Sequence, residues 1–273
     1  MNAATSPHSG ARFGALVWTF ARRDLSSRFK GTALGWLWSM IVPLATLGLY
    51  ALVFGLIFRA QVQPFGNGHP PIYAVWLFLG LIIFNFFSYG TIRAAESLWG
   101  LASVINRVRL PVYAPVLGSL VAIGLQSLVE ITLYLMVLAV LVNVSWTWLL
   151  LPIWLLLFFT FTAGLALTCA VASVYFRDVL HLLGVVMQFL LFITPVMYPL
   201  SMVPSEVGGV AVRSVLSHAP LAEFVGLARN LLYDLQPGTA QMWLTVCAWS
   251  AGALALGATV ARRYGPDIAE HLQ

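Results

Sequence analysis

The side chains that could do chemistry are few and scattered in this chain. Glu130 is the only ionisable residue well inside an apolar run, and the five histidines stand far apart at positions 8, 69, 181, 218 and 271. Neither an H-E-x-x-H zinc motif nor a G-x-x-x-x-G-K-[ST] phosphate loop occurs in the sequence. We therefore predict no metal site, no catalytic residue and no ATP hydrolysis by this chain.

Glu130 admits two interpretations. A carboxyl group inside a membrane span is a functional candidate by default, because its ionised form is costly in hydrocarbon. The alternative, which we favour, is a neutral structural side chain that is hydrogen-bonded to a neighbouring helix. A proton-driven carrier would usually carry more than one such group, so a single glutamate argues against that class.

The composition requires that these residues be carried by membrane helices. Of the 273 residues, 60% are hydrophobic and 8% are charged, whereas a soluble domain has about 25% charged residues. A chain of this length cannot hide so much apolar surface in a water-soluble core. The net charge of +5 does not indicate nucleic acid binding, because the basic residues stand at the ends of apolar runs. Cys169 and Cys247 lie within such runs, where we expect them to pack.

Six runs are long enough to cross a bilayer, which takes about 20 apolar residues in a helix. They are Gly31–Phe58, Ile72–Ile92, Leu110–Val142, Ser145–Phe176, Val179–Tyr198 and Met242–Ala261. We predict an all-α integral membrane protein with one transmembrane domain over residues 1–273 and a six-span bundle at 31–261. No internal repeat is evident, so the inverted-repeat design of many secondary transporters has no support.

The distribution of lysine and arginine predicts the orientation of the bundle. With six spans, both ends lie on the side that holds Arg12, Arg22, Arg23, Arg28, Lys30, Arg93, Arg107, Arg109, Arg177, Arg262 and Arg263. The other side holds only Arg59, Arg213 and Arg229. Both termini, including the tail at 262–273, are therefore expected in the cytoplasm.

Three segments outside the spans also have helical patterns. Residues 1–30 show apolar positions three and four apart beside arginines, which favours an amphipathic helix in the headgroup layer over a simple basic flank. The cytoplasmic residues 93–109 repeat this pattern over a shorter length. Residues 199–241 are too apolar for a solvated outer linker, and we expect short helices there that re-enter the bilayer.

Aromatic residues make up 13% of the chain and recur on two helical faces. The residues concerned are Trp36, Tyr50 and Phe54 on the first span, and Gln188, Phe192 and Tyr198 on the fifth. Aromatic rings offer flat apolar faces that suit sugar rings, so we predict that these residues line a translocation path for a long glycan. Aromatic belts at the membrane interfaces are the alternative.

Four segments, in order along the chain, resemble the permease subunits of ABC-2 type polysaccharide exporters, which move O-antigen, capsular polysaccharide or teichoic acid. They are RDLSSRFKGTALGWLWSMIVPL (23–44), SVINRVRLPVYAPVLGSL (103–120), YFRDVLHLLGVVMQFLLFITPVMYP (175–199) and SHAPLAEFVGLARNLLYD (217–234). In the last segment, His218-Ala219-Pro220 departs from the family's usual asparagine before the proline. Each motif is weak alone, but together they cover nearly the whole chain.

The resemblance implies a homodimer in which each subunit contacts a separate ABC ATPase, so ATP and Mg²⁺ belong to that partner and this chain is not an enzyme. A coupling helix would occupy about residues 95–106. The residues implied in contact with the ATPase are Glu96, Leu98, Trp99, Asn106 and Arg107. Those implied in a cytoplasmic gate are Arg23, Asp24, Arg28, Lys30, Tyr175, Phe176, Arg177 and Asp178.

The resemblance also implies an outer gate. Pro195 and Pro199 would end the fifth helix early, because proline lacks a backbone donor and clashes with the preceding turn. The chain would then fold back through re-entrant helices that carry Pro220 and Arg229. The implied setting is the bacterial inner membrane. The implied partners are a lipid-linked or long-chain polysaccharide, membrane lipid, and export proteins of the periplasm and outer membrane.

Three other functions stay open on the sequence. An ABC-2 permease for a drug or small lipid would usually lack the first and third motifs. An ion-coupled carrier would work without an ATPase. An intramembrane enzyme that polymerises or ligates glycans would need an outward-facing catalytic cluster, for which Glu206, Glu223 and Asp234 are the candidates.

Overall fold

The computed structural model describes residues 8–28, 34–101, 111–206, 208–209 and 211–268, and the regular structure of these residues is entirely helical. The α-helices are α1 (His8–Arg28), α2 (Trp38–Tyr50), α3 (Tyr73–Ser97), α5 (Tyr113–Val140), α6 (Leu151–Tyr175), α7 (Asp178–Ile193), α8 (Val212–Ser217), α9 (Pro220–Leu232) and α10 (Ala240–Tyr264). A π-helix, η2 (Ala51–Ile57), continues α2. Short 3-10 turns are η1 (Gly35–Leu37), η3 (Trp99–Leu101), η4 (Trp146–Leu150) and η5 (Leu200–Met202). The predicted all-α class is confirmed.

Five helical stretches of the described residues are long and apolar enough to cross a membrane. They are Met40–Ile57, Tyr73–Ser97, Tyr113–Val140, Trp146–Tyr175 and Ala240–Tyr264, which match the predicted first, second, third, fourth and sixth spans. The predicted fifth span is replaced by α7, which has 16 residues. At 1.5 Å per residue α7 is roughly 24 Å long, shorter than a hydrocarbon core of about 30 Å. The chain turns at Pro195 and Pro199, as the prolines predicted, and this turn leaves the helix short.

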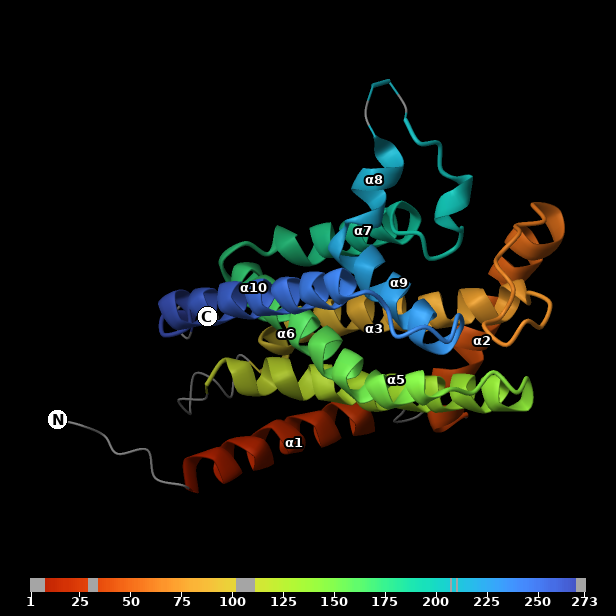
Figure 1. Cartoon of the computed structure of the whole chain (residues 1–273). Helices are drawn as coiled ribbons and strands as arrows, with labels where there is room; N and C mark the ends of the chain where they lie inside the picture. The colour runs from red at the N-terminus through yellow and green to blue at the C-terminus, as the bar shows by residue number, and fades with distance from the viewer. Residues whose placement is uncertain (1–7, 29–33, 102–110, 207, 210, 269–273) are drawn as a thin grey trace.

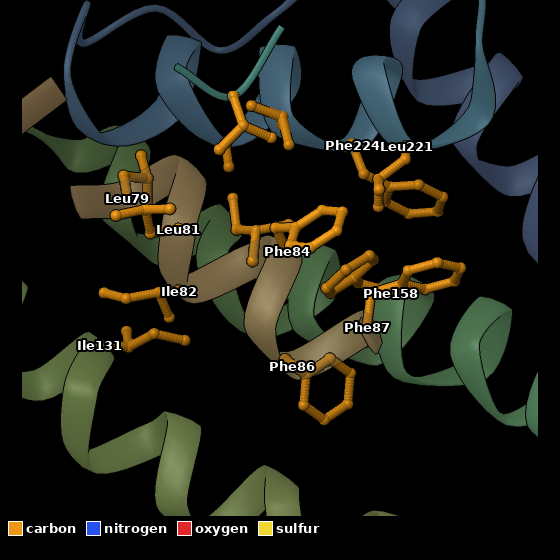
Figure 2. Close-up of a cluster of buried hydrophobic side chains, with 14 of the residues drawn as sticks. Leu79, Leu81, Ile82, Phe84, Phe86, Phe87, Ile131, Phe158, Leu221 and Phe224 are labelled. Atoms are coloured by element: carbon orange, nitrogen blue, oxygen red, sulfur yellow. The ribbon is translucent and has the colours of Figure 1, made fainter. Parts of the chain in front are cut away.

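Helix α3 forms the centre of the bundle and packs against α2, α5, α6, α7 and α9. Figure 2 shows the aromatic layer that results, in which Phe86 and Phe87 of α3 lie close to Phe158 of α6 and Phe224 of α9. The Phe158 ring centroid is 5.4 Å from that of Phe86 and 5.0 Å from that of Phe224. This layer anchors α9, an element of the outer segment, in the main core.

Helices α6 and α10 approach each other through glycines. A Cβ atom on Gly164 would lie 2.2 Å from the carbonyl oxygen of Ala253, and one on Gly257 would lie 2.3 Å from the Gly164 oxygen. The Ser250 hydroxyl donates a hydrogen bond to the Leu157 carbonyl at 2.9 Å. Small residues allow such close packing of membrane helices, so α10 is fixed on α6 along much of its length.

Helix α1 confirms that the N-terminal segment is helical. It packs against α5, where a Cβ on Gly118 would lie 2.5 Å from the Cβ of Phe20, and Figure 1 shows it running beside the first half of α5. Its expected position in the headgroup layer stays a prediction.

The outer segment contains the expected short helices, α8 with six residues and α9 with 13. Helix α9 is covered by α3, α6, η4 and α10, and Figure 1 shows it within the bundle, whereas α8 projects away from it. This difference makes α9 the part of the segment that is integrated into the core.

Candidate transport and coupling sites

Arg229 on α9 is the centre of a cluster at the end of the bundle that is predicted to face outward. Its side chain is only 8% exposed, and its Nη1 and Nη2 atoms donate to the carbonyl oxygens of Pro195 and Val196 at 2.7 and 2.8 Å. The guanidinium carbon lies 3.3 Å from the ring centroid of Trp76 on α3. One side chain therefore ties the turn after α7 to α9 and to α3.

The carbonyl groups in the turn after α7 have no helical N–H donors, because the helix has ended and proline supplies no N–H. Arg229 reaches two of them because Gly80 leaves room, since a Cβ there would lie 2.7 Å from Nη2 of Arg229. The next carbonyl, that of Met197, accepts a hydrogen bond from the Tyr73 hydroxyl. Three consecutive carbonyls are thus held by side chains of α9 and α3.

The predicted outer gate is brought together only in part. Pro195 contacts Arg229, whereas Pro199 precedes η5 and Pro220 is the first residue of α9. The Tyr198 hydroxyl donates to the carbonyls of Phe192 and Ile193 at 2.8 and 3.1 Å. Tyr198 therefore closes the end of α7 with a hydrogen bond instead of presenting its hydroxyl to a path.

The carboxyl end of α9 is held by polar side chains that the sequence did not single out. Asn143 Nδ2 donates to the carbonyls of Leu232 and Tyr233 at 2.9 and 3.0 Å, and the Thr147 hydroxyl donates to that of Leu231 at 2.7 Å. Asn143 lies between the predicted spans Leu110–Val142 and Ser145–Phe176. Its fully buried side chain satisfies carbonyls that a helix leaves free at its end.

Asp234 follows α9 and lies in the electrostatic field of Arg229. Burial raises the pKa of this carboxyl to about 6, while the Arg229 charge acts in the opposite direction. The described residues, which include Glu206, Glu223 and Asp234, contain no group of three or more His, Cys, Asp or Glu side chains that could hold a metal.

At the end of the bundle that is predicted to be cytoplasmic, a pocket of about 230 Å³ lies between α1, α5 and the end of α3. Arg23 and Asp24 of α1 line it together with Arg93 and Glu96 of α3. Arg93 Nη1 and Glu96 Oε2 are 3.1 Å apart, in an exposed ion pair. The pocket therefore brings two predicted gate residues and one predicted coupling residue to the same place.

Arg177, at the corner between α6 and α7, stacks on the predicted coupling segment. Its guanidinium carbon lies 4.4 Å from the ring centroid of Trp99 in η3, a cation–π arrangement. Among the described residues no ion pair joins Arg177 to Asp178. Asp178 lies in the first turn of α7, where a carboxylate interacts favourably with the helix dipole.

Two further contacts fix this corner. The Ser173 hydroxyl donates to the carbonyl of Ala95 at 3.4 Å, and the Tyr175 hydroxyl donates to that of Tyr264 at 3.0 Å. Phe176, which follows Tyr175 in sequence, is exposed. Leu98, the remaining described coupling residue, is fully buried, so we expect it to support the segment and not to face a partner.

Several predicted site residues lie outside what the structure describes. Lys30, Asn106 and Arg107 fall in the undescribed ranges, and the structure describes the backbone but not the side chains of Arg28 and Trp36.

The predicted translocation path is not assembled within one chain. Tyr50 and Phe54 lie on α2 and η2 with ring centroids 6.5 Å apart, partly buried against the core. Gln188 and Phe192 are exposed on one face of α7. Helix α2 and helix α7 each pack on α3, and Figure 1 shows them in different parts of the molecule.

Glu130 is 2% exposed on α5. Gln126, one turn earlier on the same helix, donates to its Oε1 atom at 3.4 Å. The expected hydrogen bond to a neighbouring helix is therefore replaced by one within α5.

These features define the class of the protein, a multi-pass membrane domain in which Arg177 and Arg229 each join segments of different helices. The chain belongs to the ABC-2 type transporter family, whose model matches residues 15–219.

Curated relatives align over most of the chain. It is 25% identical to the O-antigen export system permease protein RfbA of Myxococcus xanthus, over 96% of both chains. It is 26% identical to a protein of the same name from Klebsiella pneumoniae, over 82% of both chains. It is also 25% identical to the polysialic acid transport protein KpsM of Escherichia coli, over 76% of this chain and 77% of the relative.

Proposed function

We propose that this chain is the permease subunit of an ATP-driven exporter that moves a lipid-linked or long-chain polysaccharide across the bacterial inner membrane. Membership of the ABC-2 type transporter family supports the transport role. The relatives named for O-antigen export and polysialic acid transport support a polysaccharide cargo. Capsular polysaccharide or O-antigen is favoured over teichoic acid.

The proposed exporter contains two copies of this chain and two copies of a separate ABC ATPase, which binds ATP and Mg²⁺. This chain itself takes no cofactor and catalyses no reaction. Both of its termini lie in the cytoplasm, on the side of the ATPase, as the excess of arginine and lysine at that end of the helices indicates. Contacts with periplasmic and outer-membrane export proteins would continue the route of the glycan.

The observation that carries the proposal is the stacking of Arg177 on Trp99. Trp99 belongs to the segment that would contact the ATPase, and Arg177 immediately precedes α7. A displacement of η3 by the ATPase would therefore act directly on the start of α7. For ATP to drive transport in this scheme, the ATPase must bind one state of the permease more strongly than the other.

Helix α7 would transmit that displacement to the outer side. Its far end is tied to α9 and α3 by Arg229 and Tyr73, which hold three consecutive carbonyls of the turn. A short helix fastened at both ends moves as one piece, so cytoplasmic and outer gates would open in a coordinated way.

The glycan path would form between two copies of the chain. The outward face of α7, with Gln188 and Phe192, is exposed in the single chain, and the rings of Tyr50 and Phe54 lie at another edge. A second copy would have to bring these faces to one passage. Aromatic side chains there would bind successive sugars without requiring one pattern of hydroxyl groups.

The direct test is deletion of the gene in its host, followed by analysis of surface and intracellular glycan. The proposal expects loss of one surface polysaccharide and accumulation of its lipid-linked form in the cytoplasmic leaflet. Restoration by the wild-type gene is the control. Unchanged surface glycan together with increased sensitivity to small hydrophobic toxins would instead indicate a drug or small-lipid permease.

A further inference from the structure

A groove of about 430 Å³ runs along the side of the bundle between α3, α5 and α6. It exists because α3 packs closely on both α5 and α6, whereas α5 and α6 make few contacts with each other. Ile82, Ile83 and Phe86 of α3 form its floor. Figure 2 shows Ile82 and Phe86 on α3, with Ile131 of α5 on one side and Phe158 of α6 on the other.

The lining of the groove is almost entirely hydrocarbon. Its polar side-chain groups are the hydroxyl of Ser127 and the indole N–H of Trp154, and the latter already donates to the Phe224 carbonyl at 3.1 Å. Water needs two or more polar partners to occupy a cavity. The groove therefore offers no stable position to water, a sugar or an ion.

The groove opens sideways onto the surface that would face lipid. Leu128 on its α5 side is 45% exposed and Leu156 on its α6 side is 66% exposed. The three helices that form it are all candidate membrane spans. At this depth the surrounding solvent is hydrocarbon, so the occupant must come from the membrane.

We propose that this groove binds one acyl chain of a membrane phospholipid. Its volume of about 430 Å³ exceeds the roughly 150 Å³ of an apolar cavity that accepts benzene. An empty groove would leave its aromatic walls without the contacts that close packing supplies.

The length of the groove favours an acyl chain over a polyprenyl tail. On α5 its lining runs from Val121 to Ile131, which is roughly 15 Å at 1.5 Å per residue. This is about half of a 30 Å hydrocarbon core, the depth of one leaflet. On α6 the lining begins at Pro152, next to η4, which exposes Trp146. Tryptophan is typical of the headgroup level, whereas the lining on α5 lies about the middle of Tyr113–Val140, so the groove reaches from the Trp146 side to the middle of the bilayer.

The bound acyl chain would support α9, the helix that carries Arg229. Phe86 in the floor contacts Phe158, and Phe158 contacts Phe224 of α9, with ring centroids 5.4 and 5.0 Å apart. The acyl chain would thus lie one aromatic layer from the helix that carries Arg229. The inference rests on the membrane position of the helices and is independent of the proposed cargo.

Substitution of Gly124 by a larger residue would fill the groove. A Cβ there would lie 3.6 Å from Cε2 of Phe86 and 3.9 Å from Cε2 of Phe159, which is ordinary contact. Gly124→Leu should therefore occupy the groove without moving the helices. The matched control is Gly252→Leu on α10, where a Cβ meets no atom within 4 Å.

The test uses the purified chain in nanodiscs of phosphatidylethanolamine that carries a photoactivatable diazirine in its acyl chain. Peptide mass spectrometry should find crosslinks concentrated on the groove residues of α3, α5 and α6. Gly124→Leu should reduce them about fivefold by removing the contacts of the bound chain, and Gly252→Leu should not.

A second variant protects the test against misfolding. Leu128→Trp closes the mouth of the groove from an exposed position and should also reduce the crosslinks, with Leu244→Trp on exposed α10 surface as its control. Crosslinks spread evenly over all exposed helix faces, or unchanged by both groove variants, would overturn the proposal. Loss of the crosslinks on adding polyprenyl phosphate would also overturn it, in favour of an isoprenoid site.

Discussion

Replacement of Arg229 by methionine should remove the side-chain contacts that hold the turn after α7 against α9 and α3. The change removes two hydrogen bonds to the carbonyls of Pro195 and Val196 and the stacking on Trp76, while methionine keeps most of the side-chain volume. Each buried carbonyl left without a donor costs about 1–3 kcal/mol, and the cation–π contact contributes about 0.5–2 kcal/mol. The methionine variant no longer has the desolvation cost of a buried cation, which offsets part of this loss. We therefore expect a net destabilisation of about 2–4 kcal/mol.

The assay is thermal unfolding of the purified variant in a mild detergent, followed by intrinsic tryptophan fluorescence. For a chain of this size the expected destabilisation corresponds to a melting temperature lowered by roughly 5–15 °C. Arg229→Lys should fall between the wild type and Arg229→Met, because a lysine keeps the charge but cannot present a planar fork to two carbonyls.

Arg213→Met is the matched control for this experiment. Arg213 on α8 also donates to a backbone carbonyl, that of Val203 at 2.8 Å, but its side chain is exposed. Because water can replace that donor, its loss should cost less than about 1 kcal/mol. Equal melting temperatures of Arg229→Met and Arg213→Met would refute the reasoning that the hydrogen bonds of Arg229 contribute more to stability because they are buried.

Four further substitutions test other parts of the molecule. Gly257→Leu should sharply reduce the yield of folded protein, because its Cβ would lie 2.3 Å from the α6 backbone, and overpacking costs about 1–3 kcal/mol or more. Trp99→Leu and Arg177→Gln should each lower ATP-dependent transport in reconstituted vesicles, and the double variant should be no worse than either single one, because both remove the same contact. Asp234→Asn should raise the melting temperature at neutral pH: burial raises the pKa of this carboxyl to about 6, so the contribution of this carboxyl to stability is greatest in acid and is lost as the pH rises through that value.

Each of these predictions has a contradicting outcome. Wild-type yield of Gly257→Leu would mean that α10 does not approach α6 as described. Additive losses in the Trp99 and Arg177 variants would separate the two residues into different roles. A wild-type melting temperature for Asp234→Asn at every pH would show that the carboxyl is not strained by its burial.

The sequence predicted the local features of the fold well. The run Ile72–Ile92 corresponds to α3 at Tyr73–Ser97, and α7 begins at Asp178 and ends before Pro195. These features depend on apolar composition and on the backbone chemistry of proline, both of which act over a few residues. The length of the fifth span was overestimated because apolar residues continue through the turn that Pro195 creates.

The contacts between distant segments could not be predicted in this way. Stacking of Arg177 on Trp99, and the hydrogen bonds from Asn143 to the end of α9, depend on which helices become neighbours. No spacing within one segment encodes that choice. The predicted path residues Phe54 and Phe192 lie on different helices of the single chain, and under the proposal a second copy would have to bring them together.

The most direct test of the central claim is purification of the tagged chain from native membranes in a detergent mild enough to keep complexes intact. Mass spectrometry and native mass determination should find two copies of this chain with two copies of an ABC ATPase, and a co-purified glycan or glycolipid should identify the cargo. A homogeneous preparation without an ATPase, still able to drive transport from an ion gradient, would contradict the account.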